Sequence, residues 1–86
     1  MTTTAVDGNA AAGALFEAYG REMTLVVATC TACGQAGPLA ETVAYLQAPG
    51  VVLRCRRCDA VLIVVVAHQG GTVAHESSVR LPGGDV

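Results

Sequence analysis

The chain has 86 residues, of which 52% are hydrophobic, 3% aromatic and 14% charged, and its formal net charge is -2. This length predicts one small domain over residues 1–86 and excludes a large enzyme core. The high apolar content and low charge exclude intrinsic disorder for most of the chain. Five arginines and no lysine against seven acidic residues leave no basic excess to neutralise phosphates, so nucleic acid is not an expected partner.

The N-terminal part predicts one short α-helix over about residues 8–20. Asp7 is a favourable N-cap, and Gly20 is a typical residue to end the helix. One apolar stripe at helical spacing is formed by Ala11, Leu15 and Tyr19. A helix this short is marginal alone, so we expect it to dock on another element.

The rest of the chain, about residues 23–80, predicts antiparallel strands and hairpins, and we expect both tails, including residues 1–6, to fray. The expected strands cover residues 23–29, 39–47, 51–54, 60–67 and 72–79. In the second of these, Leu39, Val43 and Tyr45 are expected to share one face. Turns are expected at Pro49-Gly50 and at Gln69-Gly70-Gly71.

The fourth expected strand is apolar on both faces. Val61, Ile63 and Val65 would point to one side, and Leu62, Val64 and Val66 to the other. A half-exposed strand alternates apolar and polar residues instead. We therefore expect its second face to meet the N-terminal helix or another chain.

Two C-x-x-C pairs, Cys30 with Cys33 and Cys55 with Cys58, are separated by 21 residues. We call the turns Cys30–Gly34 and Cys55–Asp59 the first and second knuckle. Each turn can direct two thiolates at one ion, and the intervening residues can fold back to bring the two turns together. Four sulfurs in a tetrahedron are typical ligands of Zn²⁺. A chain of this size also needs such a staple, because its core has few large side chains.

Other uses of the four cysteines are less consistent with the sequence. Disulfides require an exported protein, but the first 12 residues show no signal peptide and the longest apolar run, 60–67, is too short for a membrane span. We therefore expect a cytoplasmic protein. Separate thioredoxin-like sites would open helices, which Gly34, Gly37 and Pro38 oppose after the first pair. A rubredoxin-like iron site uses the same four sulfurs and stays open, although Asp59 and the scarcity of aromatic residues favour zinc.

Other polar residues give weaker signals. Arg54, Arg56 and Arg57 lie beside or within the second knuckle and are expected to offset the thiolate charge, with a basic patch for an acidic partner or phosphate as the alternative. His68 and His75 are expected at a turn and on an edge strand, without a catalytic role. The sequence shows no nucleophile motif, phosphate loop or paired carboxylates, so we expect neither an enzyme nor a small-molecule substrate.

Several motifs together resemble a known family. They are Asp7-Gly8-Asn9-Ala10 at the helix start, the two C-x-x-C pairs and Pro49-Gly50 ahead of the second pair. From about Val6 to Val79 the chain is similar to a small bacterial family, domain-of-unknown-function family 6510, and the joined knuckles resemble a zinc ribbon. The resemblance implies a cytoplasmic, zinc-ribbon-like protein with the four cysteines as ligands, and it implies no activity.

These features predict a zinc-binding structural or adaptor module that binds a protein partner or forms a homo-oligomer. The alternative is a rubredoxin-like iron module that transfers electrons for an oxidoreductase. The expected fold is a small, metal-stapled β structure of antiparallel strands and hairpins, with one short N-terminal α-helix.

Overall fold

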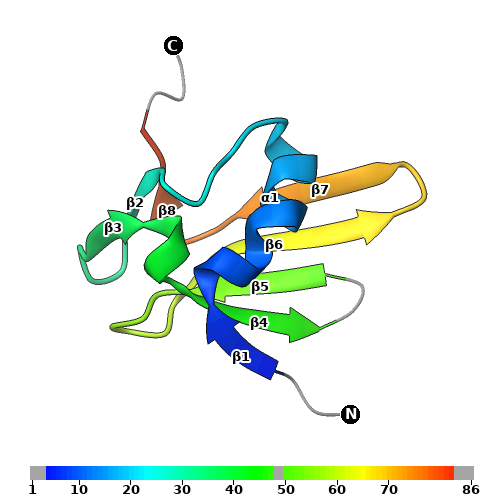
Figure 1. Ribbon diagram of the computed structural model, residues 1–86. Helices are drawn as coiled ribbons and strands as arrows, with labels where there is room; N and C mark the ends of the chain where they lie inside the picture. Colours follow the sequence, from blue (N-terminus) through cyan, green and yellow to red (C-terminus); the bar gives the residue numbers. More distant parts are fainter. Residues whose placement is uncertain (1–3, 48–49, 83–86) are drawn as a thin grey trace.

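The computed structural model describes residues 4–47 and 50–82, which form two antiparallel sheets and one α-helix (Figure 1). The larger sheet has the order β1-β4-β5-β6-β7 and the smaller sheet the order β3-β2-β8. The strands are β1 (Thr4–Asp7), β2 (Val27–Cys30), β3 (Ala36–Pro38), β4 (Val43–Gln47), β5 (Gly50–Arg54), β6 (Val61–His68), β7 (Gly71–Glu76) and β8 (Val79–Arg80). The helical segments are η1 (Gly8–Ala11), α1 (Ala12–Tyr19) and η2 (Leu39–Glu41), where η denotes a 3-10 helix. This architecture, with the four cysteines close together, confirms the predicted fold class.

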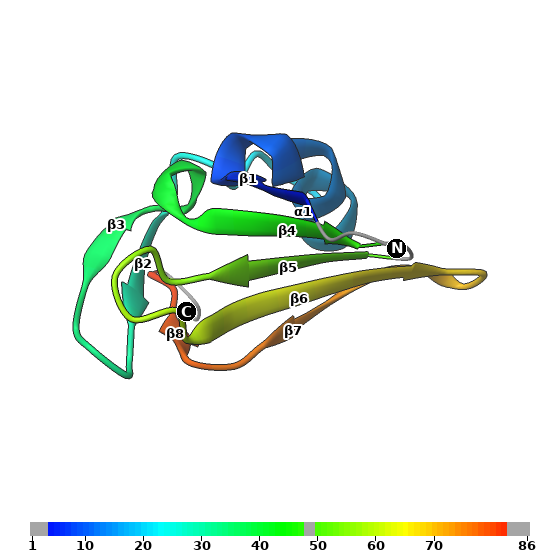
Figure 2. The ribbon, with the colours of Figure 1, turned by 90° about the horizontal axis from the view of Figure 1, so that it is seen from below.

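The predicted N-terminal helix is present, and its first turn is the 3-10 helix η1. The Asp7 carboxylate accepts a hydrogen bond of 3.0 Å from the backbone N–H of Asn9, as an N-cap does. At the other end, Gly20 has a φ of 76° and donates its N–H to the Phe16 carbonyl. Leu15 is fully buried and packs with the core of the larger sheet. Figure 2 shows that the helices lie on one side of this sheet.

The expectation that residues 1–6 fray is wrong for Thr4–Val6. These residues belong to β1, which pairs antiparallel with β4 and places Val6 opposite Ala44. Val6 packs against the core cluster, so the strand gains both a backbone ladder and apolar contacts. Both gains come from distant residues, which is why the composition of the segment did not predict them. Residues 1–3 and 83–86 lie outside the described residues.

The first predicted strand, 23–29, is shorter than expected because β2 begins at Val27. The Val26 N–H donates to the Met23 carbonyl at 3.0 Å and closes a turn instead. The side chain of Met23 is buried, with 1% of its surface exposed, whereas Leu25 is 78% exposed. Anchoring by Met23 therefore decides the conformation here, against the β propensity of the segment.

The second predicted strand, 39–47, is also shorter, because η2 occupies its first part and β4 begins at Val43. The Leu39 N–H donates to the Val26 carbonyl at 3.0 Å, and the Thr42 hydroxyl donates to the Leu39 carbonyl at 2.7 Å. Leu39 is thereby fully buried on the helix side of the sheet, whereas Val43 and Tyr45 lie on the opposite side. The predicted shared face of these three residues is wrong. Of the expected Pro49-Gly50 turn, Pro49 lies outside the described residues.

The strand predicted over 60–67 corresponds to β6 and is apolar on both sides. Ile63 and Val65 are buried on the side that faces α1. A register shift between β5 and β6, opposite Leu53 and Arg54, adds one residue to β6, and both Leu62 and Ile63 are buried. The expected grouping of Leu62 with Val64 and Val66 is therefore wrong, because a bulge interrupts simple alternation. The grouping of Val61 with Ile63 and Val65 is wrong for the same reason, since Val61 pairs with Arg54 on the other side of the sheet.

The side of the larger sheet opposite α1 is called the outer face below. Its side chains follow from the strand register. They are Ala5, Val43, Tyr45, Val52, Val61, Val64, Val66, Val73 and His75, with Asp7 and Arg54 at the knuckle end and Gln47 and His68 at the other end. None of them belongs to the buried core cluster or to the residues packed against it. The side chains on the helix-covered side of the sheet are thus more buried than those on the outer face.

The last predicted strand, 72–79, is divided between the two sheets. β7 pairs with β6, whereas β8 pairs with β2 and places Val79 opposite Cys30. The Thr31 N–H donates to the Ser78 carbonyl at 3.0 Å, so the C-terminal part of the chain supports the first knuckle. Among the described residues, none of the helices has the length and apolar character that a membrane crossing requires.

Candidate metal centre

The two knuckles meet at one end of the molecule, where the smaller sheet adjoins the larger one. Cys30 ends β2 and Cys55 follows β5 directly, while Cys33 and Cys58 lie in the turns that follow them. The four Sγ atoms all lie within 4.8 Å of one another. The structure therefore brings together every cysteine that the sequence predicted as a ligand.

The spacing of the sulfurs fits a four-coordinate metal ion. Cys30 Sγ lies 3.6 Å from Cys58 Sγ, and Cys33 Sγ lies 3.7 Å from Cys55 Sγ. A tetrahedron with metal–sulfur bonds of about 2.3 Å has edges of about 3.8 Å, close to both distances. A disulfide would need about 2.05 Å, and all four cysteines are free. The arrangement indicates a metal-binding module rather than two covalent bridges.

The two knuckles share one backbone arrangement. In each, the first cysteine donates its N–H to a carbonyl five residues later and accepts from an N–H four residues later. In the first knuckle, the Cys30–Gln35 and Gly34–Cys30 bonds both measure 2.8 Å. In the second knuckle, the Cys55–Ala60 and Asp59–Cys55 bonds both measure 2.9 Å. The repeated geometry explains how two short segments present their sulfurs in the same way.

The residue after the second cysteine of each knuckle has a left-handed backbone. Gly34 has a φ of 84°, which a glycine adopts freely, whereas Asp59 has a φ of 68°. Asp59 is the one non-glycine residue with positive φ in the described chain. Arg54 supports it by donating to the Asp59 carbonyl at 2.9 Å and by lying 3.6 Å from its carboxylate. The same guanidinium lies 5.7 Å from the Tyr45 ring centre, so it links the knuckle to the outer face.

The thiols differ in how readily they ionise. Burial acts to raise the pKa of Cys55, but the N–H groups of Cys58 and Arg57 and the neighbouring thiols outweigh it and lower the pKa to about 7. For Cys58, the N–H of Ala60 acts to lower the pKa, whereas burial and bonds to the other three thiols raise it to about 12. Four thiolates at one point therefore need a cation to balance them, and binding a metal releases protons.

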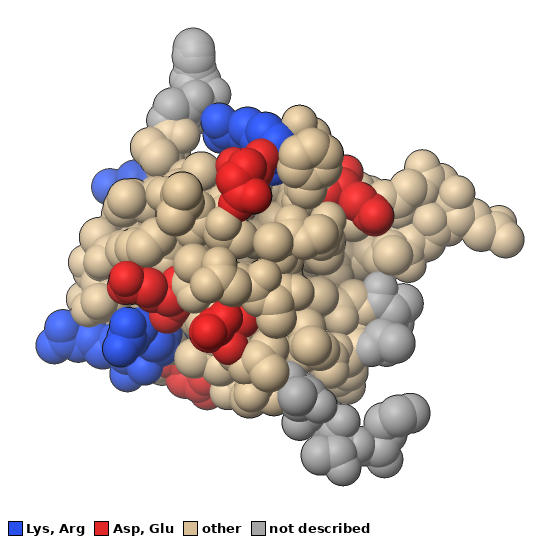
Figure 3. Space-filling model, viewed as in Figure 1, with Lys and Arg blue, Asp and Glu red and all other residues tan. Residues whose placement is uncertain are grey.

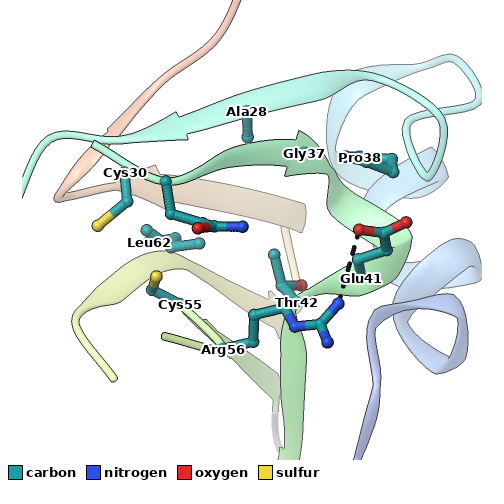
Figure 4. Close-up of a pocket in the computed structure, with 10 residues that line it drawn as sticks. Ala28, Cys30, Gly37, Pro38, Glu41, Thr42, Cys55, Arg56 and Leu62 are labelled. Atoms are coloured by element: carbon teal, nitrogen blue, oxygen red, sulfur yellow. Dashed lines mark ion pairs between the residues drawn. The ribbon is translucent and has the colours of Figure 1, made fainter. Parts of the chain in front are cut away.

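The cluster is buried on one side and open on the other. Cys30 and Cys55 expose only 2% and 4% of their surface, whereas Cys33 and Cys58 are exposed. Figure 4 shows the small hollow beside the buried pair, lined by apolar side chains such as Ala28 and Leu62. The inner half of the cluster thus rests on the apolar interior, while an ion can enter from the outer half.

The arginines near the second knuckle contact carboxylates more than sulfurs. Arg56 lies 3.6 Å from the Glu41 carboxylate at the rim of the hollow, as the dashed line in Figure 4 shows. Arg57 contributes through its backbone, because its N–H points at Cys55 Sγ at 3.4 Å. Figure 3 shows basic and acidic side chains next to one another at this end of the molecule. No sequence signal pointed to Glu41, because its partner is distant along the chain.

The histidines lie away from the sulfur cluster. His68 ends β6 at the hairpin and His75 lies on the edge strand β7, as predicted. Within residues 4–47 and 50–82, the four cysteines are the one group of His, Cys, Asp or Glu side chains that could hold a metal ion. The chemistry of the described residues is therefore concentrated in the two knuckles.

Comparison with known proteins places the chain in a family. A sequence model described as "Family of unknown function (DUF6510)" matches residues 1–81. The chain belongs to this family. No curated protein and no solved structure matches the chain. The DUF6510 match covers the helix, both knuckles and both sheets, so this DUF6510 protein carries its four-cysteine cluster inside the family region.

Proposed function

We propose that this DUF6510 protein is a zinc-binding structural module that acts by binding another protein. The observation that carries the proposal is the convergence of four Sγ atoms within 4.8 Å, from two knuckles with the same backbone geometry. Cys30, Cys33, Cys55 and Cys58 would hold the ion. A bound Zn²⁺ would join the smaller sheet to the larger one, because each knuckle belongs to a different sheet.

Zinc is the preferred metal for three reasons. Four thiolates in a tetrahedral arrangement suit Zn²⁺. The aromatic residues, Phe16, Tyr19 and Tyr45, belong to α1 and β4 rather than to the knuckles. The second knuckle also has Asp59 where a glycine would fit without strain. Iron in the same sulfurs, for electron transfer, is the alternative that the experiment must separate.

The module is proposed to have no catalytic activity of its own. A closed shell of four cysteines leaves no coordination position for water or substrate. Exposed apolar side chains support the proposed role in protein binding. Leu25 is 78% exposed and Val27 is 50% exposed, and Val27 lies opposite Pro38 in the smaller sheet.

Metal analysis of the purified protein tests the metal. We expect one zinc per chain and a colourless protein, and a red protein with one iron would select the electron-transfer alternative. Affinity capture from the native cell tests the partner, with Leu25→Asp as the variant and the wild type as reference. A captured protein that the variant loses, at unchanged zinc content, supports the proposal. Capture of the same proteins by both contradicts a role for this surface.

A further inference from the structure

The outer face of the larger sheet carries apolar side chains on all five strands. One row of side chains runs from Ala5 through Tyr45, Val52 and Val64 to His75, one residue from each strand. The neighbouring row contains Val66 opposite Val73. Because partners in an antiparallel register point to the same side, these residues form one continuous surface.

No helix or strand of the described chain covers this surface. α1 and η1 lie on the other side of the sheet, and the smaller sheet lies at its end (Figure 2). Val52, Val64 and Val66 are half-buried, whereas Ile63 and Val65 on the helix side are almost completely buried. Val73 is 39% exposed. Within residues 4–47 and 50–82, the outer face is therefore an apolar layer in contact with solvent.

The low charge of the outer face favours a partner surface that is also uncharged and apolar. Its centre consists of Val52, Val64 and Val66, without an acidic or basic side chain. The charged residues of this face, Asp7 and Arg54, share a row at one end, and the Arg54 guanidinium reaches over the Tyr45 ring and is engaged with Asp59. A neutral apolar surface exerts no attraction on a strongly charged partner. It is complementary to itself, as a two-fold interface requires.

The size of the outer face fits a small dimer. Five strands about 4.8 Å apart and about five residues long, at about 3.3 Å per residue, cover about 400 Å² in projection. β6 and β7 extend further, and the accessible area of interlocking side chains exceeds the projection. Two copies then bury about 1,000 Å², which is near the lower limit for a specific interface. The dimer is therefore expected to be reversible. The chain is also a slab of 33 × 33 × 18 Å, so two can stack by their wide sides.

We propose that two copies of this chain pair through their outer faces, with the two larger sheets stacked about 10 Å apart. Val52, Val64 and Val66 of each copy would pack between those of the other. The second, apolar side of β6 then has the covering that its sequence requires. This inference rests on the proposed function, because it takes the protein partner of the folded module to be a second copy of the chain.

The test is the molecular mass of the purified, metal-loaded chain by sedimentation equilibrium, from low micromolar to millimolar concentration. The wild type is expected to approach twice 8.7 kDa as concentration rises. Val73→Glu, and separately Val64→Glu, should stay at 8.7 kDa throughout, with unchanged circular dichroism and metal content. Val73 is already 39% exposed, so its substitution is compatible with folding.

Val27→Glu is the matched control, because Val27 is a 50% exposed strand valine on the smaller sheet. It should dimerise like the wild type. Intermolecular NOEs between outer-face valine methyls, in a sample mixed from two isotope labels, would locate the contact directly. The proposal is overturned by a wild type that stays monomeric, or by a dimer that Val27→Glu dissociates and Val73→Glu does not. A wild type that dimerises without zinc or iron leaves this inference standing and contradicts the proposed function.

Discussion

The two ends of this molecule are held together by different means. At the helix-covered end, the fully buried side chains Leu15, Leu53 and Ile63 fill the space between α1 and the larger sheet. At the knuckle end, the smaller sheet has three short strands, and the buried residues closest to it include two cysteines. The first end resembles an ordinary small core, whereas the second end buries too little apolar area to stay folded by apolar contacts alone.

The difference shows how an 86-residue chain with three aromatic residues can support two sheets. Apolar burial stabilises the larger sheet by about 25 cal/mol for each Å² removed from water. A metal bound to all four thiolates would stabilise the knuckles by joining β2 to the β5–β6 connection. The proposed metal thus substitutes for the second half of a core. The variants below separate the two contributions.

Cys30→Ser should have the largest effect, because it removes one of four proposed ligands at a buried position. Structural zinc contributes about 10–16 kcal/mol of apparent binding free energy in small domains, more than most domains have in net stability. We expect loss of zinc and of cooperative thermal unfolding, measured by metal analysis and circular dichroism. Thr31→Ala in the same knuckle is the control and should be silent. Near-native circular dichroism after complete metal removal would contradict the expectation.

Leu15→Ala tests the helix-covered end. A fully buried leucine reduced to alanine loses about 2–5 kcal/mol, depending on how far the cavity collapses. Urea unfolding of the zinc-loaded protein measures the loss, and the folded fraction should keep its zinc. Phe16→Ala, at the next residue, is the control. Phe16 is 53% exposed, so we expect its substitution to change stability by only about 0.5 kcal/mol. Equal losses of stability for the two variants would contradict a helix α1 that buries Leu15 and exposes Phe16.

Gly34→Ala compares the two knuckles. A Cβ at Gly34 meets no atom within 4 Å, so the effect is the backbone strain of a φ of 84°, about 1–2 kcal/mol. Competition with a chromophoric chelator should show weaker zinc binding, and thermal unfolding a lower midpoint.

Asp59→Gly is the reciprocal change at the equivalent position of the second knuckle. It removes strain but also the ion pair with Arg54, so the two effects should offset each other to within about 1 kcal/mol. A large destabilisation by Asp59→Gly would mean that the support from Arg54 outweighs the strain.

Tyr19→Phe should have the smallest effect. The Tyr19 hydroxyl donates to the Glu76 carboxylate at 2.7 Å and ties α1 to β7, and an exposed bond of this kind contributes about 1 kcal/mol or less. Burial, and then Glu76, raise the pKa of Tyr19, so the contribution is complete below the unfolded pKa of about 10 and is lost as pH rises through the folded pKa. Thermal unfolding at neutral and strongly alkaline pH measures both the contribution of this bond and its loss as the pH rises. Tyr45→Phe keeps its ring beside Arg54 and leaves the Tyr19–Glu76 bond in place, so it should lose stability at alkaline pH as the wild type does, whereas Tyr19→Phe should not.

Local signals in the sequence predicted much of the fold. Asp7 and Gly20 bound the helix through short-range bonds that the sequence pattern contains. β5 and β6 were predicted because their apolar runs are continuous and flanked by turn residues. β1 was missed, because its strand conformation depends on pairing with β4 rather than on its own composition.

The sequence predicted which residues form the candidate site, but not the contacts that support those residues. C-x-x-C spacing specifies two turns, and every one of the four cysteines lies in the cluster. The contacts of Arg54 with Asp59 and of Arg56 with Glu41 were not foreseen, because they depend on how η2 and the second knuckle are placed in space. The β6 bulge was likewise invisible, since it arises from the register with β5.

The sequence by itself determined the helix limits, the strongest strands and the four sulfurs, because capping, apolar runs and knuckle turns act over a few residues. Only the tertiary structure decided that Thr4–Asp7 forms an edge strand, that Leu39 turns inward and that the outer valines stay open to solvent. These outcomes depend on which distant strands pair and in which register, and a shift of one residue reverses the face of every side chain.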